Sequence, residues 1–179
     1  NQGEVVGIAG VEGNGQRELA ESILGVYPIE SGEIILGETT INDLSTRDRR
    51  ESGLSFIPED RQSQGLLMDV SLSENVILGK QSSTKYKSRY SNIKFNEASK
   101  NSNTVIENFD VRTPGNSTLA LALSGGNQQK FVVGREIENK PSLLIASQPT
   151  RGIDIGAQSL IWNKLRDARD DGLGCLLYT

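Results

Sequence analysis

The chain has 179 residues, enough for one domain of ordinary size, and its 35% hydrophobic and 23% charged residues are typical of a folded protein. The formal net charge of −4, from 19 Lys and Arg against 23 Asp and Glu, argues against a strongly basic nucleic-acid-binding protein. A single cysteine and no histidine exclude an intramolecular disulfide, a Ser-His-Asp triad and a histidine-ligated metal within this chain. No apolar run reaches the roughly 18 residues of a membrane span, so we expect a soluble domain of the cytosol.

The first 65 residues predict strands and a helix joined by glycine-rich turns. In chain order the predicted elements are a strand at 5–9, a helix at 18–24, a hairpin with strands at 33–36 and 39–41, and a strand at 54–57. The strands are short aliphatic or β-branched runs, whereas the helix has apolar residues at helical spacing and a stop at Gly25. Pro58 ends the last of these strands.

Residues 66–122 predict a helical insert, with a short helix capped by Ser73 and a longer helix at 96–109. The elements predicted beyond it are a helix at 127–137, a strand at 143–146, a helix at 158–169 and a strand at 175–178. Strands that alternate with helices predict an α/β fold with a mostly parallel sheet. The predicted organisation is a first core segment at 1–65, the insert at 66–122 and a second core segment at 123–179, in a domain that we expect to be cut at both ends.

A glycine-rich loop between the first strand and the first helix has the context of a phosphate-binding loop. Residues 10–17 read Gly-Val-Glu-Gly-Asn-Gly-Gln-Arg, and Gly10 and Gly15 have the spacing of the P-loop pattern G-x-x-x-x-G-K-[ST]. Backbone N–H groups of such a loop, with a helix N-terminus behind them, bind an anion. The lysine position holds Gln16, and the hydroxyl position, which normally binds Mg²⁺, holds Arg17. A glycine-rich turn without a ligand explains the loop, taken alone, equally well.

Two later segments carry related signals. Residues 123–130 read Leu-Ser-Gly-Gly-Asn-Gln-Gln-Lys before a predicted helix, and Ser124 with two glycines leaves backbone donors at the helix N-terminus. The strand at 143–146 leads into Ser147 and Gln148, where a Walker B strand ends in two acidic residues. A capped helix and a core strand with a polar end are the alternative interpretations of these segments.

Together these motifs resemble the nucleotide-binding domain of an ABC transporter, and the resemblance covers essentially the whole chain. In order, the motifs are the degenerate P-loop, Pro58-Glu59-Asp60-Arg61, the Leu-Ser-Gly-Gly-Asn-Gln-Gln signature and a Gln-Pro-Thr-Arg-Gly tail. The resemblance implies a P-loop NTPase core of the ABC type, with a mostly parallel sheet, an antiparallel β hairpin region and a helical insert subdomain. The finer resemblance is to the second ATP-binding half of a tandem importer ATPase for sugars or nucleosides, and most to the nucleoside-type branch served by basic-membrane-protein lipoproteins.

In this family two such domains meet head to tail, and each ATP lies between the P-loop of one half and the signature of the other. The nucleotide-binding residues that the resemblance implies are Gly10, Gly13, Asn14, Gly15, Gln16, Arg17, Glu18, Glu59, Ser124, Gly125, Gly126, Asn127 and Asp154. Glu59 stands at the family's Q-loop glutamine and, with Ser147, is a weak candidate ligand for Mg²⁺. Asp154 matches the D-loop aspartate, which crosses the dimer interface. The switch histidine and the adenine-stacking aromatic of the family lie outside this sequence.

The departures from the family pattern imply an asymmetric pair of sites. Gln16 lacks the lysine charge, Gln148 at the general-base position cannot accept the proton, and Ser147 is a poor Mg²⁺ ligand. We therefore expect this half alone to be catalytically impaired, while Ser124 of the intact signature acts in trans on the partner's site. The implied cofactors are ATP and Mg²⁺. The implied partners are the other ATPase half, membrane permease subunits and, indirectly, a substrate-binding lipoprotein, with no nucleic acid, at the cytoplasmic face of the plasma membrane.

Two other functions compete with an importer ATPase. One is a nucleotide-sensing regulatory ABC module that binds but does not hydrolyse, and the other is a soluble ABC protein of DNA repair or chromosome handling. A long coiled-coil insert or zinc-binding cysteines would favour the last, and the sequence contains neither. A lysine-rich stretch at 80–100 fits a solvated loop better than a lipid or nucleic-acid patch. The solute is not encoded here, because in this family it is chosen by the permease and the lipoprotein.

Overall fold

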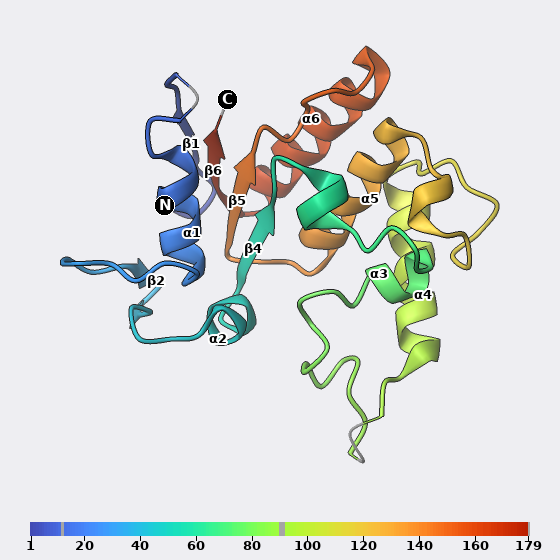
Figure 1. The fold of residues 1–179 in the computed structure, drawn as a ribbon, viewed down its shortest axis with the longest axis horizontal. Coiled ribbons are helices and arrows are strands. Elements are labelled where there is room, and N and C mark those ends of the chain that lie inside the picture. The colour runs from blue at the N-terminus through green and yellow to red at the C-terminus, as the bar shows by residue number, and fades with distance from the viewer. Residues whose placement is uncertain (12, 90–91, 179) are drawn as a thin grey trace.

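The core of the protein is a four-stranded parallel sheet in the order β1-β6-β5-β4 (Figure 1), seen in a computed structural model that describes residues 1–11, 13–89 and 92–178. Its strands are β1 (Val5–Ile8), β4 (Leu54–Ile57), β5 (Leu143–Ser147) and β6 (Gly174–Tyr178). All three strand pairs are parallel. The α/β fold predicted from the alternation of strands and helices is therefore confirmed.

Alternate residues of β5 face two separate hydrophobic cores. Leu144 and Ala146, both fully buried, pack in the larger core with residues of the helices α5 (Gly125–Glu138) and α6 (Ile155–Asp170). Ile145 faces the other side and packs in a smaller core with α1 (Gln16–Leu24). Figure 1 shows the same arrangement, with α1 on one side of the sheet and α5 and α6 on the other. This two-sided burial explains why β5 is an uninterrupted apolar run.

A small antiparallel hairpin forms a second sheet, as predicted, but it is shorter than expected. β2 (Ile35–Leu36) and β3 (Thr39–Thr40) are joined at Gly37 and Glu38, and Gly37 has φ 63°. The hairpin therefore has two residues in each strand, where the sequence predicted strands at 33–36 and 39–41. Its short ladder is one reason the exposed Ile35 lies outside both cores.

The segment between β4 and β5 contains four further helical elements. They are the π-helical turn η1 (Arg61–Gly65), α3 (Leu72–Asn75), α4 (Phe95–Asn108) and the 3-10 turn η2 (Ala120–Ala122). The cap of α3 is Ser71 and not the predicted Ser73: Ser71 Oγ accepts from the N–H of Glu74, whose carboxylate accepts from the N–H of Ser71. α4 packs on α5, because Gly134 leaves room there for the buried ring of Phe109. The boundaries of the helical insert at residues 66 and 122 stay a prediction.

Three helices differ from the sequence-based expectations. α5 and α6 begin at Gly125 and Ile155, earlier than predicted, because their first turns contain glycines, which are typical of turns. The helix α2 (Thr46–Glu51) was not predicted at all. Ser45 and Asp48, which form its N-terminal cap, were the available signal.

Arg49 of α2 ties this short helix to the end of α1. The side chain is 4% exposed and donates hydrogen bonds of 2.6–2.9 Å to four backbone carbonyls. Those carbonyls belong to Ser22, Ile23, Asn42 and Leu44. Two of them lie in the last turn of α1, where carbonyl groups have no partner within the helix. Arg49 therefore serves as the C-terminal cap of α1 as well as the anchor of α2.

We expect the substitution Arg49→Ala to lower the free energy of unfolding by about 3 kcal/mol, because it leaves buried carbonyls without donors. Urea unfolding measures this change. The control is Arg47→Ala, which removes an exposed arginine from the same helix and should change the value by less than about 0.5 kcal/mol. Equal losses in the two variants would contradict the capping role of Arg49.

Candidate functional site

A pocket of about 560 Å³ opens at the carboxyl edge of the parallel sheet. Its lining combines residues that follow the four strands: Gly10 and Gly13 after β1, Glu59 and Asp60 after β4, Ser147 and Gln148 at the end of β5, and Tyr178 at the end of β6. Ligands of open α/β sheets bind at this edge, since the loops after parallel strands converge there. The pocket therefore lies where the glycine-rich loop predicts a phosphate site.

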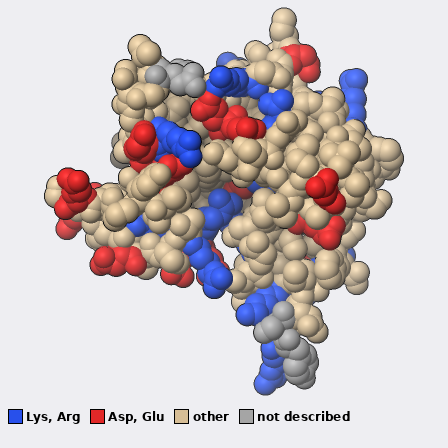
Figure 2. All heavy atoms as spheres, viewed as in Figure 1, with Lys and Arg blue, Asp and Glu red and all other residues tan. Residues whose placement is uncertain are grey.

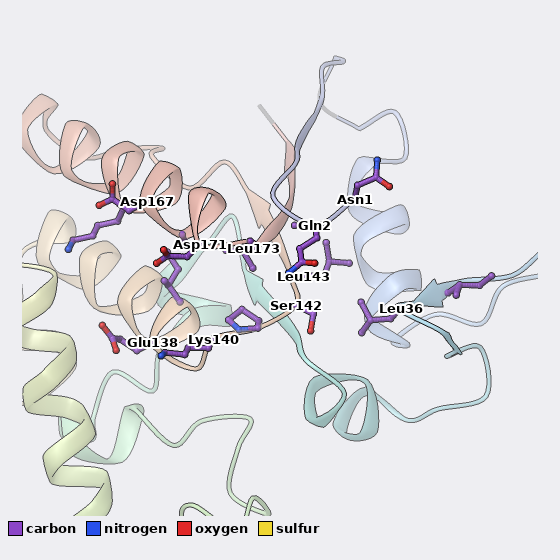
Figure 3. A pocket seen from close by; sticks show the side chains of 18 of the residues that line it. Asn1, Gln2, Leu36, Glu138, Lys140, Ser142, Leu143, Asp167, Asp171 and Leu173 are labelled. Atoms are coloured by element: carbon purple, nitrogen blue, oxygen red, sulfur yellow. The ribbon is translucent and has the colours of Figure 1, made fainter.

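A larger cavity of about 1220 Å³ lies at the opposite edge of the sheet (Figure 3). Its lining includes Gln2, Ser142, Leu143 and Asp171, near the amino ends of β1 and β5 and the C-terminus of α6. No residue predicted for nucleotide binding lines it. The larger cavity is therefore not the one that the predicted site residues line. The candidate functional site is the smaller pocket, which seven of those residues line.

The backbone of the loop has the shape that anion binding requires. Gly13 and Gly15 have φ angles of 91° and 96°, a left-handed conformation that glycine adopts without strain. Gly15 precedes α1, and no side chain caps this helix end. The positive end of α1 therefore lies directly behind the loop.

The side chain of Gln16 occupies this loop. Its Nε2 donates to the carbonyl of Val11 at 2.9 Å, and its Oε1 accepts from the N–H of Asn14 at 3.0 Å. A Cβ atom placed on Gly10 would lie 2.6 Å from Gln16 Nε2, which shows how closely the amide packs against the loop. The N–H of Asn14 also donates to the carbonyl of Val11 at 3.3 Å, so this donor of the loop is shared between the neutral amide and the backbone.

Arg17 brings no free positive charge to the pocket. Its Nε pairs with Glu21 Oε1 at 2.7 Å, one helical turn along α1. The pocket lining holds one arginine against three carboxylates, those of Glu21, Glu59 and Asp60. Glu21 is paired with Arg17 and Glu59 with Arg151, and the exposed Asp60 adds a negative charge that opposes a polyphosphate.

Both carboxylates after β4 are already engaged. Glu59 forms an ion pair with Arg151. Asp60 caps η1 and accepts from the N–H groups of Gln62 and Ser63 at 2.9 and 3.2 Å. The Ser63 side chain and these two N–H groups hold the pKa of Asp60 below its usual value, so the exposed carboxylate is ionised at neutral pH.

Ser147 and Gln148 lie on the pocket wall, as the Walker B comparison predicts. Gln148 has φ 46°, and its N–H donates to the carbonyl of Tyr178 at 3.0 Å, which turns the chain sharply after β5. The described residues contain no group of three or more cysteine, aspartate or glutamate side chains suited to a metal ion. Mg²⁺ prefers several oxygen ligands, and the predicted pair offers one hydroxyl and one carboxylate that is bound to Arg151. The residues present therefore fit Mg²⁺ poorly.

The signature residues form a second, separate surface at the N-terminus of α5. Ser124 is exposed and makes no side-chain cap, and its Oγ accepts from Asn127 Nδ2 at 2.9 Å. Asp154, the N-cap of α6, accepts from the N–H of Ala157 at 3.0 Å. Asp154 Oδ2 would lie 2.9 Å from a Cβ atom on Gly126, so the signature and the D-loop aspartate are neighbours.

The structure divides the predicted site residues into two groups. Gly10, Gly13, Gln16, Arg17, Glu59, Ser147 and Gln148 line the pocket. The others lie outside its described lining: Asn14, Gly15, Glu18, Ser124, Gly125, Gly126, Asn127 and Asp154. The sequence reasoning missed Phe56, Ser63, Gln64 and Tyr178, which also line the pocket. Of these four, only Phe56 and Tyr178 could have been found from the sequence, because they lie near the carboxyl ends of predicted strands.

The basic stretch between α3 and α4 projects from the body of the protein, and Figure 2 shows Lys and Arg side chains at its tip. Lys85 Nζ donates to Asn101 Oδ1 at 3.1 Å, and Lys94 Nζ donates to the carbonyl of Thr84 at 2.8 Å. The stretch is anchored by the buried Tyr86, whose hydroxyl accepts from Asn101. Two of these lysines thus have contacts within the protein. Tyr90, a second tyrosine of this stretch, lies outside the described residues.

Comparison with known proteins identifies the family. The family model described as ABC transporter matches residues 1–151. The chain belongs to the ABC transporter family. It is 47% identical over 180 residues to the guanosine import ATP-binding protein NupO of Bacillus subtilis (strain 168), covering 99% of this chain and 34% of that protein. It is 42% identical over 180 residues to the nucleoside import ATP-binding protein NupA of Lactococcus lactis subsp. cremoris (strain MG1363), covering 99% of this chain and 35% of that protein.

A solved structure of the same family confirms the fold. The ATP-binding cassette MJ0796, seen as a dimer in a post-hydrolysis state with ADP and Pi, superposes with a TM-score of 0.81 at 24% identity. The match covers 100% of this ABC transporter chain and 75% of that chain. The chain spans about a third of the length of the curated relatives it matches. In the part of the chain that is described, no helix is both long and apolar enough to cross a bilayer.

If Gln16 closes the loop, Gln16→Ala should leave the N–H of Asn14 with one acceptor, the carbonyl of Val11 at 3.3 Å, and so speed its exchange. A hydrogen bond worth about 1 kcal/mol corresponds to a roughly fivefold change in amide exchange. Hydrogen–deuterium exchange of the peptide that contains Asn14 measures it. The control Gln158→Ala removes a glutamine that bonds the carbonyl of Ile153 on α6, and should leave that peptide unchanged. Unaltered exchange in Gln16→Ala would show that the amide does not hold the loop.

Proposed function

We propose that this chain is the second, degenerate ATP-binding half of a tandem ABC importer ATPase for nucleosides or simple sugars. Its own P-loop pocket does not hydrolyse ATP, and its signature completes the ATPase site of the partner half. The observation that carries the proposal is the contrast between two helix N-termini. The loop before α1 is filled by Gln16, whereas α5 begins after the exposed Ser124, which makes no side-chain cap.

The pocket lacks the groups that phosphoryl transfer requires. A nucleotide would have to displace Gln16 from two hydrogen bonds, and no lysine replaces them with charge-assisted contacts of about 1.5–3 kcal/mol each. Gln148 cannot act as the general base, a role worth about 10²–10⁴-fold in rate. These losses fall on one site and are not additive. Together they leave a pocket that binds nucleotide weakly or holds it unhydrolysed.

The signature keeps the groups that bind phosphate. The first N–H groups of a helix have no partner within it, and in α5 they follow the exposed Ser124. Gly125 and Gly126 add no side chains of their own there, and the side chains that pack on them are those of Arg61 and Asp154. α5 has 14 residues, long enough for a full dipole at its N-terminus. We infer that these backbone donors face ATP held by the partner half, and that Asp154 lies at the same interface.

An importer ATPase half also requires partner proteins and a location at the membrane. The relatives are about three times as long as this chain, which supports a second ATPase half in the same polypeptide. We infer that the assembled pair binds ATP with Mg²⁺ at the competent site, docks on membrane permease subunits at the cytoplasmic face, and works indirectly with a substrate-binding lipoprotein. A nucleoside is the favoured solute, because NupO and NupA are named for guanosine and nucleoside import. We further infer that residues 1–65 and 123–179 together form the core of the domain, and that residues 66–122 form a helical insert in it.

A nucleotide-sensing regulatory module is the second candidate. The pocket of about 560 Å³ favours it, because a site that has lost its catalytic groups can still hold a ligand. The two candidates differ in one respect: only the importer ATPase half needs an intact signature for turnover by the pair.

Ser124→Arg in the complete tandem ATPase should lower ATP turnover to background, since a bulky cation blocks the backbone donors of α5. Gln16→Ala should leave turnover within about threefold, because its pocket is not the working site. Steady-state ATP hydrolysis measures both variants. The matched control is Ser159→Arg, which places the same side chain at an exposed position of α6. Full activity of Ser124→Arg would favour the sensing module, and loss of activity in Gln16→Ala would contradict the asymmetric pair.

A further inference from the structure

Arg61, the first residue of η1, extends to the signature. A Cβ atom on Gly125 would lie 2.6 Å from Arg61 Nη2 and 3.5 Å from its Cζ, so the guanidinium packs directly on the first residue of α5. Its Nη1 donates to the carbonyl of Arg151 at 3.3 Å. The Nε atom is buried and has no hydrogen-bond partner among the described residues. The guanidinium thus joins the signature to the segment that follows β5.

This placement is unfavourable for the isolated domain. The N-terminus of a helix is its positive end, and a cation beside it is repelled. Acidic residues stand at three other helical starts, where Asp154 caps α6, Asp60 caps η1 and Asp48 lies in the first turn of α2, whereas Lys94 precedes α4 and Arg17 lies in the first turn of α1. Within the fold, the carbonyl of Arg151 holds the guanidinium and the carboxylate of Asp154 lies beside Gly126. The start of α5 therefore combines the positive end of the helix with the positive charge of Arg61, which suits a bound anion.

The rest of η1 fixes the position of Arg61 relative to α5. Gln62 Nε2 donates to Gln128 Oε1 at 3.1 Å, and Arg135 Nη1 donates to the carbonyl of Gly65 at 2.9 Å. With Gly125, the contacts on α5 fall at intervals of three and seven residues, which lie on one face of a helix. The turn is therefore attached along α5, and Arg61 is its contact with the signature end.

We propose that Arg61 is a positioning residue of the shared ATP site: it holds the signature against the segment after β5 and adds positive charge where the partner half's phosphates would bind. The inference rests on the proposed function, since it requires that the signature completes the partner's site. In phosphoryl transfer, preorganised positive groups stabilise the transition state more than the bound substrate. Arg61 should therefore affect kcat more than the KM for ATP.

The test is steady-state ATP hydrolysis by the complete tandem ATPase with Arg61→Ala, Arg61→Lys and Ser124→Arg. We expect Arg61→Ala to lower kcat about tenfold and to change the KM for ATP by less than about threefold. Arg61→Lys, which keeps the charge but loses the planar fork that reaches both Gly125 and Arg151, should restore the part of the loss that is due to charge. The matched control is Arg47→Ala on α2, an exposed arginine remote from the signature in the chain, with activity expected within about twofold.

The outcomes separate this inference from the proposed function. If Ser124→Arg is inactive and Arg61→Ala keeps its kcat, Arg61 has no positioning role although the signature still works. If Ser124→Arg is active, the proposed function fails and the role of Arg61 fails with it. A loss of kcat in Arg61→Ala that comes with a lowered melting temperature and is not restored by Arg61→Lys would assign Arg61 to the fold alone. Loss of kcat at an unchanged melting temperature, restored by lysine, supports the proposal.

Discussion

A network of buried ion pairs on α5 fixes the position of the segments that form the P-loop pocket and the signature. Glu136 is 1% exposed, and its two carboxylate oxygens accept from Arg135 Nε at 3.0 Å and from Arg50 Nη2 at 2.8 Å. Burial alone would raise the pKa of Glu136, but the two arginines hold it below its usual value, so the carboxylate is charged at neutral pH. Such a group is stable only with its partners, and removal of one partner of a buried pair costs about 3–5 kcal/mol. The network therefore fixes one arrangement of α5 against its neighbours.

The same network connects the pocket wall with the signature. Arg135 donates from Nη1 to the carbonyls of Gly65 at 2.9 Å and Asn75 at 3.3 Å, at the ends of η1 and α3. Ser63 and Gln64 of η1 line the P-loop pocket, whereas Ser124 stands at the start of α5. Because Arg135 belongs to α5, a shift of η1 that widens the pocket would have to move α5 or break these bonds. The wall of the P-loop pocket and the signature are thus connected through Arg135.

Sequence patterns predicted the elements whose stability comes from apolar burial. The run from Leu143 to Ala146 identified β5 because both faces of that strand are covered. The turn η1 has no such signal, since Arg-Gln-Ser-Gln-Gly contains no apolar residue. Its shape depends on Asp60 beside it and on Gln128 and Arg135, which lie more than 60 residues further along the chain. Contacts at that separation are invisible to local periodicity.

The positions of single side chains in the candidate site could not be predicted from sequence patterns either. The sequence showed that Gln16 replaces the lysine of a P-loop, but not that the amide folds back on Val11 and Asn14. An isolated P-loop without its lysine still has a glycine backbone and a helix dipole, and so still predicts an anion site. The position of the amide changes that prediction, because it satisfies a donor that would otherwise attract phosphate. The proposed asymmetry of the two ATP sites therefore depends on which helix terminus is filled, and the volume of the pocket does not decide it.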